Sequence, residues 1–271
     1  MTTITASLVK ELREKTGVGM MDCKKALSET NGDFEEAITY LREKGLSAAA
    51  KKSDRETKEG RVFVTISADA KIGSIVEVGC ETDFVANNEA FSAFGNAVAA
   101  EVLAKRYSDL TALEAATIDG KPFATFSSEA ILKLGENLGV RRVALLDGAA
   151  LSSYIHSNGK IGILVAFTGA ISEDLGKDVA MQVAAAAPIC VRSEEVPTGE
   201  LEKEKSIVRA QLLNEGKPEA MVDKIVEGKI LKYYKDVCLL EQTFVKDQEK
   251  TVKQILPANV TVSQFIRFSL V

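Results

Sequence analysis

The sequence predicts an α+β protein: an N-terminal three-helix bundle, then a core of two related α+β subdomains with antiparallel sheets and an inserted antiparallel helical hairpin. Three observations support this class. Apolar residues recur at helical spacing near the N-terminus, apolar and polar residues alternate as in paired strands after residue 61, and one strand motif occurs twice. We expect an N-terminal module over residues 1–46, a linker over 47–60, and core subdomains over 61–147 and 148–271, with the hairpin at about 198–236.

The N-terminal helices are separated by breaks that contain glycine. Apolar stripes at helical spacing predict a first helix around residues 8–12 and a second around residues 20–27. Asp33, followed three residues later by Glu36, matches a capping box. It opens a third helix, which we expect to end at Gly45.

A bundle of this size has little core of its own, so we expect part of its apolar surface to serve a partner. Met20 and Met21 are the candidates, because flexible thioethers adapt to a foreign surface. The alternative is that one of the two methionines packs inside the bundle. Residues 48–60 carry many charges without an apolar face, which predicts a helix tail that runs into a solvated linker.

The first subdomain opens with a predicted β-hairpin. Residues 62–66 alternate as a strand, the chain turns, and residues 72–78 return as its partner. Residues 82–88 then form a strand-to-helix loop with Phe84 at its tip. A Phe in this position either folds back onto the core or is offered to another molecule, because functional residues concentrate in such loops.

The remainder of the first subdomain is less regular. A helix follows the loop, and we expect residues 108–128 to be mostly an excursion with short helical pieces. An apolar stripe then predicts a helix that Gly139 closes, and residues 140–146 read as the next strand.

A short internal repeat predicts the second subdomain. The segment AKIGSIV at residues 70–76 resembles GKIGILV at residues 159–165, and an Ala- and Val-rich helix follows each copy. In the second copy we expect a strand at residues 154–156, a turn at 157–159 and a helix over 178–187.

The repeat omits one part of the first subdomain. The loop of the second copy, residues 168–172, has no segment equivalent to residues 82–85, although Ile171 is a possible counterpart of Phe84 as a structural plug. This asymmetry favours a function for Asp83 and Phe84.

Two charged helices over residues 198–214 and 219–236 are joined by a turn at residues 216–218. Each has a narrow apolar stripe, formed by Leu201, Val208 and Leu212 in the first helix. In the second helix we expect Met221, Ile225, Val226 and Tyr233 to face inward. We expect this hairpin to project from the body of the protein. Its apolar stripes either pack only against each other, which the sequence slightly favours, or bind a partner or a second copy of the chain. Residues 260–268 end the chain as a strand.

The composition restricts the class of partner and the compartment. The 39 acidic and 34 basic residues give a net charge of −5, which is unsuited to general nucleic-acid binding, so we expect a protein partner or a small ligand. The four cysteines lie far apart without a C-x-x-C pair, which suits reduced thiols in a cytoplasmic protein. We find neither an export signal nor an apolar stretch of the roughly 20 residues that a bilayer span needs, so no membrane contact is expected.

The sequence shows no apparatus for bond-making catalysis. It has neither a G-x-x-x-x-G-K-[ST] loop nor a G-x-G-x-x-G turn after a strand, and we expect no cofactor and no metal. His156 is the single histidine and lies in no nucleophile motif, so we expect no catalytic residue. An enzyme that uses His156, and a chaperone-like adaptor that uses the N-terminal module and the hairpin, are the alternatives.

Two long motifs carry a family resemblance: LREKTGVGMMDCKKAL at residues 12–27 and EVGCETDFV at residues 77–85. Shorter pieces at residues 154–165, 216–218, 224–228 and 244–247 extend it over nearly the whole chain. The sequence resembles the elongation factor Ts family, although Gly79 stands where Asn is common. The chain also stops soon after Phe268, so we expect it to lack the C-terminal helical module of some members.

The resemblance implies a guanine-nucleotide exchange factor that binds elongation factor Tu in its GDP-bound and nucleotide-free states. It implies that the N-terminal module is similar to ubiquitin-associated domains. Asp83 and Phe84 would intrude near the partner's nucleotide and displace its magnesium, with Thr82 and Val85 framing them. The further partner contacts implied in this way are Leu12, Arg13, Met20 and Met21 and, more weakly, His156.

Overall fold

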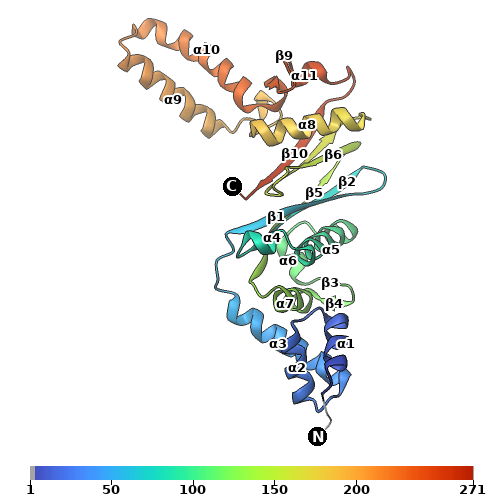
Figure 1. The fold of residues 1–271 in the computed structure, drawn as a ribbon. Helices are drawn as coiled ribbons and strands as arrows, with labels where there is room; N and C mark the ends of the chain where they lie inside the picture. Colours follow the sequence, from blue (N-terminus) through green and yellow to red (C-terminus); the bar gives the residue numbers. More distant parts are fainter. Residues whose placement is uncertain (1–3, 271) are drawn as a thin grey trace. The chain divides into compact units, whose positions relative to one another are not determined.

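The computed structural model describes residues 4–270, and the chain divides into two compact units. Within the described range, the first unit comprises residues 4–65, 74–145 and 270, and the second comprises residues 66–73 and 146–269. Both units combine α-helices with antiparallel sheets (Figure 1). The α+β class predicted from the sequence is confirmed, whereas the finer division into an N-terminal module, a linker and two related subdomains stays a prediction.

The first unit begins with three helices: α1 (Ala6–Thr16), α2 (Met20–Glu29) and α3 (Phe34–Lys52). The hydroxyl of Thr5 accepts a hydrogen bond at the start of α1, and Asp33 caps α3 by accepting the backbone N–H of Glu36. Our expectation that the third helix ends at Gly45 was wrong, because α3 continues to Lys52.

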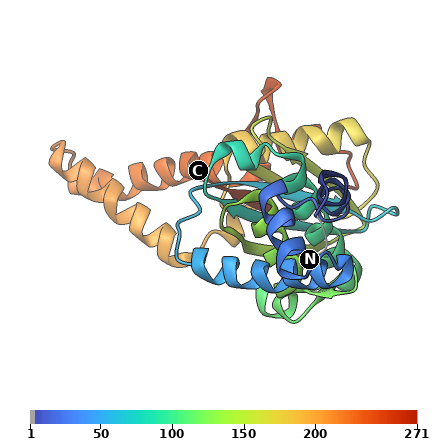
Figure 2. The ribbon, with the colours of Figure 1, turned by 60° about the horizontal axis from the view of Figure 1, so that its bottom comes forward.

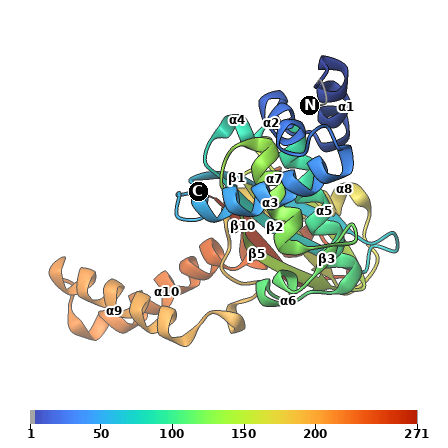
Figure 3. The ribbon, with the colours of Figure 1, turned by 90° about the horizontal axis from the view of Figure 1, so that it is seen from below.

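Gly45 remains helical because it is a packing position. A Cβ at Gly45 would lie 3.3 Å from the carbonyl oxygen of Ser128, so the missing side chain lets α3 approach α7 (Phe123–Leu134) closely (Figure 3). A glycine inside a helix costs backbone entropy, and here the close helix contact offsets that cost.

A three-stranded sheet in the order β1-β2-β5 forms the centre of this unit, with β1 at Glu59–Ile66, β2 at Ile72–Cys80 and β5 at Leu138–Asp147. Helix α5 (Glu89–Lys105) contributes Phe91, Phe94 and Val98 to the core that covers the sheet. The strand pattern was predicted because β-branched residues alternate there.

The segment expected to be an excursion is largely regular. It contains α6 (Leu110–Glu114), the short strands β3 (Thr117–Ile118) and β4 (Lys121–Pro122), and the first half of α7. We expected Gly139 to close this helix, but α7 is closed four residues earlier by Gly135. The left-handed φ of 79° at Gly135 reverses the chain before β5.

The second unit holds a sheet in the order β10-β7-β6, with β6 at Ala150–Ile155, β7 at Ile161–Phe167 and β10 at Val262–Ser269. Both pairings are antiparallel, and Tyr154 of β6 lies opposite Ile163 of β7. Helix α8 (Glu173–Ala186) packs on this sheet. It begins earlier than the predicted residue 178, because the Ser172 hydroxyl caps its first turn.

The helical hairpin consists of α9 (Thr198–Asn214) and α10 (Glu219–Val237), which run antiparallel beside each other (orange in Figure 2). Val208 and Leu212 pack against Val222, Val226 and Ile230. The expectation that Met221 faces inward was wrong: it is 57% exposed, and the neighbouring Val222 occupies the buried position instead.

Short elements complete the second unit. They are the 3-10 turns η1 (Ser193–Glu195) and η2 (Leu239–Glu241), the strands β8 (Thr243–Phe244) and β9 (Asp247–Thr251), and the helix α11 (Val252–Ile255). Phe244 and Val252 join the core that α8 forms with the sheet, so this returning segment is part of the body of the unit.

Candidate functional site

A single helical turn, α4 (Asp83–Ala86), follows β2 at the place where we predicted a loop. The turn forms because Thr82 provides an N-cap: its hydroxyl accepts the backbone N–H of Val85 at 3.4 Å. Asn88 then caps α5 by accepting the N–H of Ala90 at 2.8 Å. Capping at both ends fixes the backbone between the strand and the long helix.

The turn sends consecutive side chains in opposite directions. Val85 and Ala86 are buried in the core of the first unit, whereas Phe84 is 84% exposed. The alternative in which Phe84 folds back onto the core is therefore contradicted. An exposed phenyl ring on a turn whose next two residues are anchored is suited to contact another molecule.

Asp83 accompanies Phe84 on the exposed side of the turn. Its carbonyl oxygen accepts hydrogen bonds from the backbone N–H and the side-chain amide of Asn87, at 3.0 and 2.9 Å. These bonds use the backbone of Asp83 and leave its carboxylate at the surface. The turn thus presents one negative charge and one aromatic ring side by side.

The interior below the turn is apolar. Cys80 ends β2, is fully buried, and points its thiol at the carbonyl oxygen of Thr82 at 3.1 Å. Burial raises the pKa of the Cys80 thiol to about 12, and the carboxylates of Glu136 and Glu59 add to the effect. Cys80 is therefore a neutral packing residue and no nucleophile.

Sequence reasoning missed Glu136. Its carboxylate accepts a hydrogen bond from the Thr82 hydroxyl at 2.6 Å, although 54 residues separate the two. Glu136 lies in no motif or periodic pattern, so only the three-dimensional contact identifies it.

The residues predicted in the N-terminal helices divide into two groups. Met20 and Met21, at the start of α2, are 50% and 76% exposed, and Arg13 is exposed on α1. The alternative with one buried methionine is thus contradicted. Leu12 is fully buried among Val9, Cys23, Leu27 and other apolar residues, so its side chain holds the three helices together.

His156 lies in the second unit, in the turn after β6, and is exposed. Its Nδ1 lies 3.1 Å from the hydroxyl of Tyr154. The contact lies on the exposed surface of the hairpin formed by β6 and β7.

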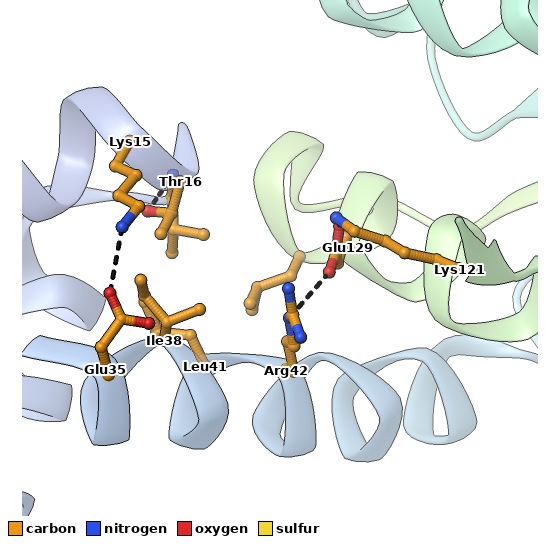
Figure 4. A pocket seen from close by; sticks show the side chains of 10 residues that line it. Lys15, Thr16, Glu35, Ile38, Leu41, Arg42, Lys121 and Glu129 are labelled. Carbon is orange, nitrogen blue, oxygen red and sulfur yellow. Dashed lines mark hydrogen bonds and ion pairs between the residues drawn. The ribbon is translucent and has the colours of Figure 1, made fainter. Parts of the chain in front are cut away.

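A separate cavity of about 300 Å³ lies between the N-terminal helices and α7 (Figure 4). Ile38, Leu41 and Leu132 provide apolar parts of its lining. Its charged lining residues pair among themselves: Lys15 with Glu35, and both Arg42 and Lys121 with Glu129. The pair of Arg42 and Glu129 joins α3 to α7, and the charged side chains of this lining offer no unpaired charge to a ligand.

Within residues 4–270, no cluster of three or more His, Cys, Asp or Glu side chains is arranged to hold a metal ion. In the same range, no helix combines the length and apolar character needed to cross a membrane.

Comparison with known proteins places the chain in a family. A family model described as elongation factor TS matches residues 81–271. Elongation factor Ts of Clostridium perfringens (strain SM101 / Type A) is 48% identical over 279 residues, covering 98% of this chain and 92% of the relative. The elongation factors Ts of two Clostridium botulinum strains, Eklund 17B / Type B and ATCC 19397 / Type A, are 48% and 47% identical with the same coverage. The chain belongs to the elongation factor Ts family.

Proposed function

We propose that this chain binds elongation factor Tu in its GDP-bound form and accelerates GDP release by inserting Asp83 and Phe84 near the nucleotide and its magnesium ion. Nucleotide exchange on elongation factor Tu is the known role of the family to which the chain belongs. The observation that carries the proposal is the 84% exposure of Phe84 on a turn that its neighbours anchor in the core. Such a factor makes and breaks no covalent bond.

The thermodynamic requirement is simple. The factor must bind the nucleotide-free partner more tightly than the GDP-bound partner, and linkage then makes each ligand weaken the binding of the other. A thousandfold faster release requires the barrier to fall by about 4 kcal/mol. Two terms are available at α4.

The first term is burial of Phe84. Transfer of one Phe side chain from water to an apolar pocket contributes about 2 kcal/mol, and an aromatic at the centre of an interface contributes more. Since Phe84 is exposed in the free chain, this energy is not already used in folding. It is therefore gained only when the ring enters the partner.

The second term is electrostatic. A magnesium site near phosphates depends on the balance of local charge, and a carboxylate introduced there competes for the ion and repels the phosphates. Asp83 directly precedes Phe84, so insertion of the ring brings this carboxylate with it. Thr82 and Val85 frame the pair, as the cap and the core anchor of the turn.

We propose that the N-terminal helices add binding energy through Arg13, Met20 and Met21, which are exposed on α1 and α2. Leu12 supports this surface from inside the bundle, since its side chain is buried. His156 is proposed as a weaker contact from the second unit.

The test is stopped-flow release of labelled GDP from elongation factor Tu at saturating factor. We expect Phe84→Ala to slow release about thirtyfold, the equivalent of about 2 kcal/mol, while the circular dichroism of the chain is unchanged. Leu46→Ala is the matched control, because Leu46 is an exposed apolar residue of the same unit. Unchanged release by Phe84→Ala would refute the role assigned to this ring.

We also propose that the hairpin mediates self-association. Ile207 and Leu213 on α9, and Met221 and Leu231 on α10, are exposed apolar residues that support this proposal. Sedimentation equilibrium of the chain and of Leu231→Lys tests it: a concentration-dependent dimer that the substitution dissociates is expected, and a monomer at all concentrations contradicts it.

A further inference from the structure

Gly135, Glu136 and Asn137 connect α7 to β5 and make hydrogen bonds in two directions. In the first, both carboxylate oxygens of Glu136 face the residues before α4. Oε2 accepts the backbone N–H groups of Glu81 and Thr82 at 3.0 and 2.9 Å, and Oε1 accepts the Thr82 hydroxyl at 2.6 Å. Three donors converge on one side chain, which is an arrangement typical of an ionised carboxylate.

In the second direction, the same segment binds the chain that leaves α3. The side-chain amide of Asn137 donates to the carbonyl oxygens of Ser53 and Arg55, at 3.3 and 2.9 Å. Lys52 donates to the carbonyl oxygen of Gly135 at 2.5 Å. The backbone N–H of Asn137 also donates to Glu81 at 2.6 Å, so the end of α3, residues 135–137 and the approach to α4 meet in one network.

The Thr82 hydroxyl explains why this network affects the turn. A hydroxyl has one proton, and at Thr82 that proton is directed to Glu136. The oxygen lone pairs are then available to accept the N–H of Val85, which is the cap of α4. Glu136 thereby sets the orientation of the hydroxyl on which the cap depends.

Helix α4 depends on such outside support because it has only four residues. An isolated helix of this length does not form, since nucleation costs more than so few hydrogen bonds return. Burial of Val85 and Ala86 anchors its C-terminal half, and the cap at Thr82 anchors its N-terminal end. Phe84 lies between these two anchors.

We propose that Glu136 is a positioning residue for nucleotide exchange: it holds Thr82 so that α4 presents Phe84 already ordered for entry into the partner. The inference rests on the proposed function, because it assumes that Phe84 is the inserted group. Binding by a preordered group avoids the entropy cost of ordering it in the complex. Loss of Glu136 is therefore expected to weaken association and to leave the maximal rate of exchange nearly unchanged.

The experiment compares Glu136→Gln with the unaltered chain in GDP release from elongation factor Tu, over a range of factor concentrations. We expect the half-saturating concentration to rise about tenfold and the maximal rate to change less than twofold. Thr82→Val removes the hydroxyl and is expected to reproduce this pattern. Glu114→Gln is the charge-matched control, because Glu114 is exposed on α6.

A readout in the free chain separates positioning from function. Hydrogen exchange at the amides of Thr82 and Val85 is expected to accelerate at least tenfold in Glu136→Gln, while amides in the middle of α5 keep their protection. If these two amides exchange at the original rate, or if the half-saturating concentration does not move, the positioning role is overturned.

A double-mutant cycle with Phe84→Ala distinguishes the two proposals. In the Phe84→Ala background, Glu136→Gln is expected to shift the half-saturating concentration less than twofold, since no ring remains to be positioned. A full shift in that background shows a general structural effect and overturns the inference. If Phe84→Ala alone leaves GDP release unchanged, the proposed function fails instead, and the amide readout still reports whether Glu136 orders the turn.

Discussion

Phe84 and Val85 are consecutive residues of one helical turn, yet Phe84 exposes 84% of its surface and Val85 exposes 9%. The division assigns the two side chains different tasks. Val85 and Ala86 connect the turn to the core that contains Phe91 and Phe94, whereas Phe84 is not part of that core.

The first prediction separates stability from exchange at these two positions. Val85→Ala is expected to lower the free energy of unfolding by roughly 1–3 kcal/mol, because it removes buried apolar surface and leaves a cavity. Phe84→Ala is expected to change it by less than about 0.5 kcal/mol, as for other exposed positions. Urea unfolding followed by circular dichroism measures both, and equal losses would contradict the assignment.

Substitution by alanine is expected to have opposite effects on stability at two helical glycines. A Cβ at Gly95 in α5 would lie 2.1 Å from the ring of Phe63, whereas Gly228 in α10 has nothing within 4 Å of that position. Gly95→Ala is expected to destabilise the first unit by roughly 1–3 kcal/mol through overpacking. Gly228→Ala is expected to stabilise the hairpin by about 0.5–1 kcal/mol, since alanine loses less backbone entropy.

Hydrogen exchange measures the effects of the two substitutions separately, because the amides of α5 and α10 report the local stability of different units. Increased protection in α5 of Gly95→Ala would be incompatible with the close contact to Phe63.

Removal of the buried negative charge of Glu77 is expected to lower the free energy of unfolding. Its side chain is 5% exposed, pairs with Arg141 at 3.2 Å, and accepts a hydrogen bond from Nε of Arg142 at 2.7 Å. Glu77→Gln removes the negative charge that both guanidinium groups contact. Because both arginines retain partial contact with water, the expected loss is roughly 1–3 kcal/mol.

Glu202→Gln is the control for Glu77→Gln. Glu202 pairs with Lys205 on the surface of α9, where its side chain is 62% exposed, so its loss is expected to change stability by less than about 0.5 kcal/mol. Similar losses for the two variants would contradict the importance of burial at Glu77.

The two buried thiols of Cys80 and Cys238 are expected to react slowly with labelling reagents. Burial is the main cause that raises the pKa of Cys80 and Cys238 from 9.0 to about 12, and the neighbouring Cys190 thiol adds to the effect at Cys238. At pH 8 the thiolate fraction of each is then on the order of a thousandfold below that of an unfolded chain. We expect labelling by a disulfide reagent to be slow in the folded protein and fast in urea.

The same shifts determine stability at alkaline pH. The folded state holds these two protons more tightly than the unfolded state, so the contribution is fully present below pH 9 and is lost as pH rises toward about 12. Thermal unfolding between pH 8 and 11 is expected to show a falling midpoint. Fast labelling of Cys80 at pH 8 under native conditions would contradict its burial.

Several features followed from the sequence alone. Hydrophobic periodicity located the strands around residues 62–66 and 72–78, and it placed α9 correctly and α10 within one residue of its C-terminal end. These elements are determined locally, because the alternation of side chains and the turn residues lie within the elements themselves. The motifs at residues 12–27 and 77–85 were sufficient to identify the family.

Other features were decided only by tertiary structure. Gly45 stays inside a helix because of Ser128, and the direction of Phe84 depends on the burial of Val85 in a core assembled from distant segments. Periodicity did not distinguish the buried Val222 from the exposed Met221, which are adjacent. The contact between Glu136 and Thr82 spans 54 residues. Such contacts are absent from local patterns because they depend on how the folded chain packs. Two of them, the contact of Glu136 with Thr82 and the burial of Val85, determine how the turn that carries Phe84 is held.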